Sequence, residues 1–146
     1  MLVATFHARP VSWVVAAVGP LLSGAVFSLP LPGAVVRRLL AGTSAPRALI
    51  EAFQAAVASV DPVVLADRAR SALAVDVSTD VTRAQVPMLF IRATRDALIR
   101  ETVVDELRVL NPSIEVTEII APHLVLQVAP EASAAVIAAF VDRQAR

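Results

Sequence analysis

The run VPMLFIRATRD, residues 86–96, is apolar over Met88–Ile91 and ends in polar and charged residues. A short apolar run behind a proline is typical of a buried strand. An amphipathic helix is predicted over Thr102–Leu110, and a second strand over Ile114–Ile120. Pro130 begins a last predicted helix. The order strand, helix, strand, helix predicts an α/β unit with a parallel sheet and a right-handed crossover.

Two polar residues follow the two predicted strands. Asp96 comes directly after the first strand, and His123 comes shortly after the second. Because the carboxyl ends of parallel strands meet at one edge of the sheet, we expect both side chains on the same rim. A carboxylate that accepts the Nδ1 proton of an imidazole fixes its tautomer and stabilises the imidazolium, and the imidazole can then take a proton from a hydroxyl. Asp96 and His123 are therefore candidate catalytic residues.

The residues ahead of this unit have a different pattern. Leu2–Phe6 is a short apolar run that is compatible with a buried strand, and residues 10–80 show helical spacings separated by turns. The predicted helical pieces are Val11–Val18, Pro20–Phe27, Val35–Leu40 ending at Gly42, Ala45–Val60, and a helix to Leu73 with Asp61 as N-cap. Three regions follow: a first strand and loop at 1–9, a helical region at 10–82 and the α/β unit at 83–146.

Composition leaves two explanations for an apolar fraction of 57%. One is a membrane segment, and residues 10–36 carry no charge over a length sufficient to cross a bilayer. Pro20, Pro30 and Pro32 interrupt that segment, however, and a proline inside a helix costs about 3 kcal/mol. The other explanation is a chain that lacks partner surface for its apolar residues. We therefore expect a cytoplasmic protein rather than a membrane-associated one.

Several classes of site are excluded or disfavoured. The formal net charge is zero, so nucleic-acid binding is not expected. The chain has no cysteine and only two histidines, which leaves no thiolate site and no multi-histidine metal site. We expect neither a metal nor a cofactor. All 13 basic residues are arginine, and with the abundance of alanine and valine this indicates a bacterial, GC-rich genome.

The α/β unit resembles the α/β-hydrolase family. In that family a strand ending in Gly-x-x-Asp supplies the acid, and a later Gly-His shortly before Pro-Glu supplies the base. The corresponding residues here are Ala93-Thr94-Arg95-Asp96 and Pro122-His123, with Pro130-Glu131 behind them. The resemblance covers residues 86–143 and implies that Asp96 is the acid and His123 the base. Ala93 and Pro122 replace the usual glycines.

The resemblance also implies a fold and a reaction. The expected fold is a partial α/β-hydrolase-like parallel sheet of about three strands, with residues 10–82 as a helical cap and Leu2–Phe6 as the strand after the nucleophile helix. The family reaction is hydrolysis of an ester or related bond by Ser-His-Asp acyl-enzyme chemistry, with the serine in a Gly-x-Ser-x-Gly elbow. This chain contains no such elbow. The serine is expected upstream of Met1, and we expect a truncated chain with little activity alone.

Three aromatic residues, Trp13, Phe27 and Phe53, either pack in the core or lid or line a hydrophobic acyl pocket, in which case the substrate is a small hydrophobic ester. His7 is expected at a strand end, facing a pocket or solvent. Two alternatives remain open. One is a non-catalytic fragment that pairs with another polypeptide, or with itself, through an open sheet edge at Leu2–Phe6. The other is a small membrane-associated protein anchored by residues 10–36.

Overall fold

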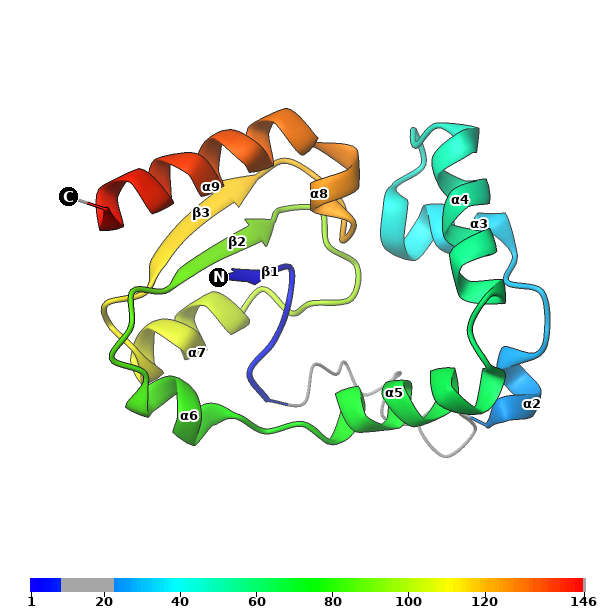
Figure 1. Ribbon diagram of the computed structural model, residues 1–146, viewed down its shortest axis with the longest axis horizontal. Coiled ribbons are helices and arrows are strands. Elements are labelled where there is room, and N and C mark those ends of the chain that lie inside the picture. Colours follow the sequence, from blue (N-terminus) through cyan, green and yellow to red (C-terminus); the bar gives the residue numbers. More distant parts are fainter. Residues whose placement is uncertain (9–22, 146) are drawn as a thin grey trace.

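The computed structural model describes residues 1–8 and 23–145 (Figure 1). Their three strands form one parallel sheet in the order β1-β2-β3. The strands are β1 at Leu2–Val3, β2 at Leu89–Ala93 and β3 at Glu115–Ile119. In the central strand, Phe90 pairs with Leu2 on one side and with Val116 on the other. The predicted α/β class with a parallel sheet of about three strands is confirmed.

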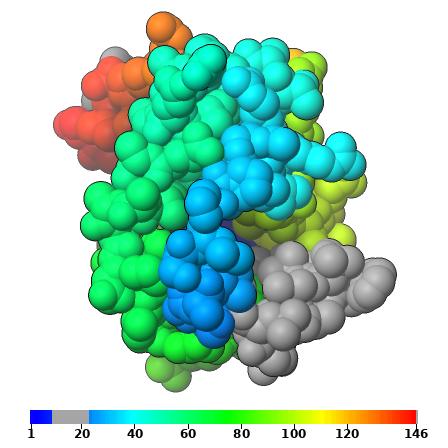
Figure 2. All heavy atoms as spheres, turned by 90° about the vertical axis from the view of Figure 1, so that its right-hand side faces the viewer, coloured from blue at the N-terminus to red at the C-terminus, as the bar shows by residue number. Residues whose placement is uncertain are grey.

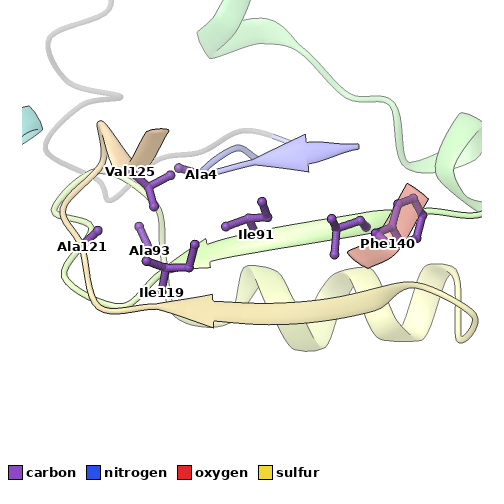
Figure 3. Packing of buried hydrophobic residues seen from close by; sticks show 8 residues of the cluster. Ala4, Ile91, Ala93, Ile119, Ala121, Val125 and Phe140 are labelled. Atoms are coloured by element: carbon purple, nitrogen blue, oxygen red, sulfur yellow. The ribbon is translucent and has the colours of Figure 1, made fainter. Parts of the chain in front are cut away.

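Helices cover both faces of the sheet, because side chains of β2 alternate between two apolar layers. Phe90 packs with Val104 and Leu107 on the face covered by α6 and α7. Leu89 and Ile91 pack on the opposite face with residues of α8 and α9 (Figure 3). These helices are α6 at Ser78–Arg83, α7 at Val103–Leu110, α8 at Val125–Val128 and α9 at Pro130–Gln144.

A helical cap, defined here as residues 23–74, stands beside the sheet (Figure 1) and forms most of the coloured face that is turned to the viewer in Figure 2. Its elements are α2 at Gly24–Phe27, α3 at Gly33–Val36, the π-helical turn η2 at Arg37–Ala41, α4 at Arg47–Ala58 and α5 at Pro62–Ala74. The cap has its own small core, made by Val36, Ala41, Ala45 and Ile50. Asp61 caps α5 as predicted, since its Oδ1 accepts a 2.7 Å hydrogen bond from the backbone N–H of Val63.

The sheet and the cap are joined by two chain segments that lie side by side. Ala8 forms an antiparallel bridge with Asp76, and the carbonyl of His7 accepts a hydrogen bond of 2.7 Å from the N–H of Val77. The segment that follows β1 is thereby fixed to the segment that returns from the cap to α6.

Some boundaries differ from the sequence prediction. β1 contains two residues rather than the five of Leu2–Phe6, because Ala4 has a φ of 41° and leaves the extended conformation. The short helices α6 and α8 were not predicted, since four to six residues give too little periodicity. The predicted helix Val11–Val18 lies outside the described residues.

Among the described residues, no single helix has both the length and the apolar character needed to cross a bilayer. Taken together, α4 and α5 pass the same length and hydropathy criteria, but the pair is bent by 102°. Residues 10–22 of the uncharged segment 10–36 lie outside the described residues, and the described part, 23–36, contains only the four-residue helices α2 and α3.

Candidate active site

Asp96 and His123 lie next to each other because backbone pairing continues beyond the ends of β2 and β3. The N–H of Thr94 donates to the carbonyl of Ile119, and the N–H of Arg95 donates to the carbonyl of Ala121, each at 3.0 Å. The loop after β2 and the loop after β3 therefore run together along the carboxyl edge of the sheet. This edge is the expected location of functional groups in a parallel α/β sheet.

The carboxylate of Asp96 is held through both of its oxygens. Oδ2 lies 2.9 Å from Nδ1 of His123. Oδ1 accepts hydrogen bonds from the backbone N–H groups of Leu98 and Ile99, at 2.8 and 3.0 Å. The Asp96 side chain is only 5% exposed, so its position is set by these three hydrogen-bonding groups.

The hydrogen bond defines which nitrogen of His123 carries the proton. An ionised carboxylate only accepts hydrogen bonds, so Nδ1 must be the donor. In the neutral ring Nε2 then has the free lone pair. The side chain of His123 is 24% exposed, and no group of the described residues hydrogen-bonds to Nε2. The pair thus presents an oriented base whose reactive nitrogen is available to a proton donor.

Two arginines flank the acid in sequence without contacting it in the described structure. Arg95 is exposed. Arg100 is paired with Glu106 of α7, with 3.1 Å between Nη2 and Oε1. The charge of Arg100 is therefore directed to α7, and His123 is the ion-pair partner of Asp96 among the described residues.

The space beside Asp96 is small. A cavity of about 30 Å³ adjoins the carboxylate, and its other lining residues include Ala4, Phe90 and Ile99. That volume suits about one water molecule rather than a substrate. A complete substrate pocket is therefore not present between the described residues at this edge of the sheet.

The predicted aromatic residues lie elsewhere. Phe27 lines a hollow of about 340 Å³ in the cap, together with Leu31, Gln54 and Val57. Phe53 packs against the small core of the cap. Neither lines the cavity at Asp96, and Trp13 falls outside the described residues. A role for these three aromatic residues in substrate binding stays a prediction.

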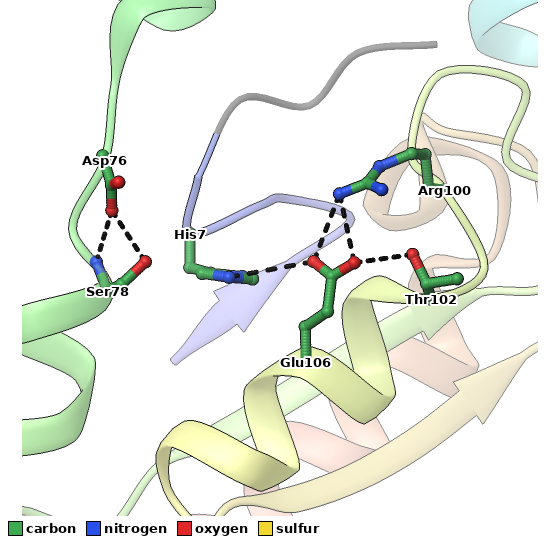
Figure 4. A network of polar contacts seen from close by, with 6 residues as sticks. All are labelled: His7, Asp76, Ser78, Arg100, Thr102 and Glu106. Atoms are coloured by element: carbon green, nitrogen blue, oxygen red, sulfur yellow. Dashed lines mark hydrogen bonds and ion pairs between the residues drawn. The ribbon is translucent and has the colours of Figure 1, made fainter.

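His7 is buried rather than solvated. Its Nε2 lies 3.8 Å from Oε2 of Glu106, and the carboxylate of Glu106 also contacts Arg100 and Thr102 (Figure 4). Its Nδ1 has no hydrogen-bond partner among the described residues. Together with Ser78 and Leu110, the ring borders a shallow surface hollow of about 420 Å³. His7 thus faces a hollow beside α6 and α7, far along the chain from the Asp96–His123 pair.

Several contacts at this edge had no signal in the sequence. Backbone donors such as the N–H groups of Leu98 and Ile99 carry no side-chain pattern. The same is true of the carbonyl of Leu40 in the cap, which accepts a 2.9 Å hydrogen bond from the N–H of Leu124.

Within the described ranges, no group of three or more His, Cys, Asp or Glu side chains is placed to hold a metal ion.

Comparison with known proteins places this arrangement in a known fold. No family model and no curated protein sequence matches the chain. Solved structures do, and three of them are an enol-lactonase from Burkholderia xenovorans LB400, an alpha/beta hydrolase enzyme from a Medee basin deep-sea metagenome library, and an esterase from Rhodococcus sp. ECU1013. Their identities to this chain are 18%, 16% and 16%, with TM-scores of 0.70, 0.67 and 0.63.

Coverage differs between the two sides of each comparison. The matches cover 95%, 96% and 94% of this chain, but 53%, 54% and 49% of the three solved chains. The chain therefore spans about half the length of the structures that it matches. At these identities the likeness establishes the fold, and the fold is that of part of an α/β-hydrolase.

Proposed function

We propose that this chain supplies the acid and the base of a hydrolase that cleaves an ester or a related bond through an acyl-enzyme. The observation that supports this most directly is the 2.9 Å contact between Nδ1 of His123 and Oδ2 of Asp96 at the carboxyl edge of the sheet. The solved structures with this fold include an esterase and an enol-lactonase, both of which act on ester-type bonds by name.

The geometry assigns a separate task to each residue. Asp96 holds the Nδ1–H of His123 and stabilises the imidazolium that forms during the reaction. Nε2 of His123 accepts the proton of a serine hydroxyl as the serine oxygen bonds to the acyl carbon. His123 then donates that proton to the leaving alcohol. In the second half, Nε2 accepts a proton from water as the water oxygen bonds to the acyl carbon, and it donates that proton to the serine oxygen as the bond from serine to the acyl carbon breaks and the carboxylic acid leaves.

The nucleophile is proposed to come from a segment outside these 146 residues. None of the described serines forms a hydrogen bond with His123. β1 pairs with β2 on one side only, which leaves its outer edge free among the described strands. A strand that enters the sheet beside β1 would bring its own carboxyl end to the edge where Asp96 and His123 lie. The substrate class that we propose is a small hydrophobic ester or acyl compound, in line with the apolar cap.

The decisive experiment compares this chain with a longer product of its coding DNA. If the DNA upstream of Met1 reads in frame through a Gly-x-Ser-x-Gly segment, the longer protein should hydrolyse p-nitrophenyl butyrate, and the 146-residue chain should stay near the uncatalysed rate. In the longer protein, His123→Ala should lower kcat by about 10⁴-fold or more. His7→Gln is the matched histidine control and should keep most of the activity.

Two outcomes would contradict the proposal. One is ester hydrolysis by the 146-residue chain that disappears with His123→Ala, since the nucleophile would then lie within it. The other is a longer protein that is active but indifferent to His123→Ala, since the pair would then have no part in the chemistry.

A second candidate is a non-catalytic interaction fragment, favoured by the outer edge of β1, which pairs with no other strand in the described part of the chain. The N–H of Ala4 donates to Ile91 of β2 at 3.0 Å, so the N–H of Val3 points to the free edge. Val3→Pro removes that outward donor and keeps the bonds to β2. If the wild-type chain self-associates in analytical ultracentrifugation and Val3→Pro is a monomer, the edge is the contact. Association that is unchanged by Val3→Pro would exclude the outer edge of β1 as the contact.

A cytoplasmic location of the protein remains a prediction.

A further inference from the structure

The loop that carries His123 is attached to the cap on both sides of the histidine. On one side, the N–H of Leu124 donates to the carbonyl of Leu40 in η2 at 2.9 Å. The side chain of Leu124 also packs against the small core of the cap. On the other side, the ring of Pro122 lies against Gly42, the residue that ends η2. Both neighbours of the base in sequence are therefore cap contacts.

Gly42 is suited to this contact in two respects. Its φ of 82° and ψ of 156° lie in a region of backbone conformation that is essentially restricted to glycine. A Cβ at this position would stand 3.3 Å from Cγ and 3.6 Å from Cβ of Pro122. The missing side chain thus allows the turn after η2 and the close approach of the proline ring at the same time.

His123 itself is fixed from the opposite direction by Asp96. Its Nδ1 contacts the carboxylate at 2.9 Å, and its carbonyl accepts a bond of 2.8 Å from the N–H of Val125 at the start of α8. The imidazole therefore lies between the acid on the sheet and a loop whose flanking residues rest on the cap. The contacts of Pro122 and Leu124 are the path by which a shift of the end of η2 would reach the ring.

We propose that Gly42 is a positioning residue for His123, so that the cap sets the orientation of the base relative to the acid. The inference rests on the acid and base roles proposed above. It assigns the cap a task in orienting the base, because displacement of η2 weakens the contact between Nδ1 and Asp96. Pro122 occupies a position at which the α/β-hydrolase family usually has glycine, and it is the residue through which Gly42 acts on His123.

The test uses the full chain with ¹⁵N-labelled histidine. NMR of the ring nitrogens gives the ratio of Nδ1-protonated to Nε2-protonated His123, and His7→Gln assigns the signals because the chain has two histidines. Gly42→Ala should lower that ratio by about threefold or more, as expected for residues that share a contact. Gly24→Ala is the matched control, since its Cβ meets Cγ2 of Val63 at 3.2 Å within the cap. The control should leave the ratio at the wild-type value.

A double-mutant cycle separates positioning from loss of stability. Gly42→Ala also strains the backbone at φ 82°, and this part of its effect should lower the melting temperature whether or not Pro122 is present. Its effect on the His123 ratio should be clearly smaller in a Pro122→Gly background, because the ring that transmits the displacement is gone. An equal change of the ratio in both backgrounds would overturn the proposal.

Two further outcomes complete the test. If Gly42→Ala does not fold, Pro122→Ala removes most of the ring from the contact and should by itself lower the ratio; an unchanged ratio in this folded variant overturns the proposal. Because the measurement needs no nucleophile, it is independent of ester hydrolysis. If Gly42→Ala lowers the ratio of Nδ1-protonated to Nε2-protonated His123 but the longer protein has no esterase activity, the positioning role is supported and the proposed function fails.

Discussion

Oδ2 of Asp96 lies 2.9 Å from Nδ1 of His123, although 27 residues separate the two in the chain. The intervening residues form α7 and β3, so one helix and one strand return the chain to the same edge of the sheet. The second oxygen of Asp96 is occupied by two backbone N–H groups of its own loop. The carboxylate therefore orders the acid loop and orients the imidazole at the same time.

Asp96→Asn should reverse the tautomer of His123. The amide has nearly the shape of the carboxylate, so its oxygen can still accept from Leu98 and Ile99 while its NH₂ faces the ring. An NH₂ group donates, so Nδ1 must become the acceptor and the proton moves to Nε2. We expect ¹⁵N NMR to show mainly Nε2-protonated His123 in this variant. In an active longer protein, kcat should fall by about 10⁴-fold.

The control for this prediction is Asp105→Asn on α7, an exposed carboxylate that is ion-paired with Arg108 at 3.8 Å. It should leave the His123 tautomer unchanged. A wild-type ratio of the two tautomers in Asp96→Asn would contradict the assignment of Nδ1 as the donor to Asp96.

Leu107→Ala should strongly destabilise the protein. The side chain is fully buried between α7 and β2, where it packs with Phe90 and Val103. Large-to-small changes of buried leucine cost about 2–5 kcal/mol because a cavity remains. Urea unfolding followed by circular dichroism measures the change in the free energy of unfolding. Val109→Ala, on the same helix but 81% exposed, is the control and should stay within about 0.5 kcal/mol of wild type.

Similar losses for Leu107→Ala and Val109→Ala would mean that α7 does not cover the sheet as described. A loss for Leu107→Ala below about 1 kcal/mol, with Val109→Ala neutral, would contradict the packing of Leu107 between helix and strand.

The α/β unit was predictable because its elements are regular and its pattern is local. The sequence of β2 is a continuous apolar run over Leu89–Ile91 because helices cover both faces of the sheet. Leu89 packs in the apolar core on one face, and Phe90 packs in the core on the other. α7 shows its buried face at helical spacing, with Val103, Val104 and Leu107 inward. The positions of Asp96 and His123 follow from strand ends alone. Their contact could therefore be predicted without knowledge of the loops.

The other features of the fold and the site depend on tertiary contacts, which produce no periodic pattern in the sequence. β1 stops after Val3 because Ala4 has a positive φ, which alanine rarely adopts. The contact of Pro122 with Gly42 joins residues 80 positions apart, and neither residue type signals the other. The two alternatives for Phe27 and Phe53, packing in the core or lid or lining a substrate pocket, came from residue type alone; the structure places both residues in the cap, and a role in substrate binding stays a prediction.

Asn111 should prove important for stability, although the sequence suggests only that Asn111-Pro112 ends a helix. Its Nδ2 donates to the carbonyls of Val81 and Ala84, each at 3.2 Å, and so fastens α6 to the end of α7. Its Oδ1 accepts from Ser113 through both N–H and hydroxyl. Asn111→Ala leaves the buried carbonyl of Val81 and the partly buried carbonyl of Ala84 without this partner, and we expect a loss of about 1–3 kcal/mol in urea unfolding.

Ser113→Ala is the matched control for Asn111→Ala, because it removes a single hydroxyl donor and keeps both bonds to α6. It should cost about 1 kcal/mol or less. If Ser113→Ala costs as much as Asn111→Ala, the bonds to Val81 and Ala84 contribute little and the proposed link between α6 and α7 is wrong.

The two histidines should differ in their reactivity with diethyl pyrocarbonate, which acylates an unprotonated imidazole nitrogen. The side chain of His123 is 24% exposed, and its Nε2 keeps a free lone pair because Nδ1 donates to Asp96. The side chain of His7 is 8% exposed and is packed at Glu106. Mass spectrometry over time should show one fast and one slow site, with His123 modified several times faster. His123→Ala should retain only the slow site, and unfolding in urea should make both histidines of the wild type react alike. A faster reaction at His7 in the folded chain would contradict the burial of His7 against α7.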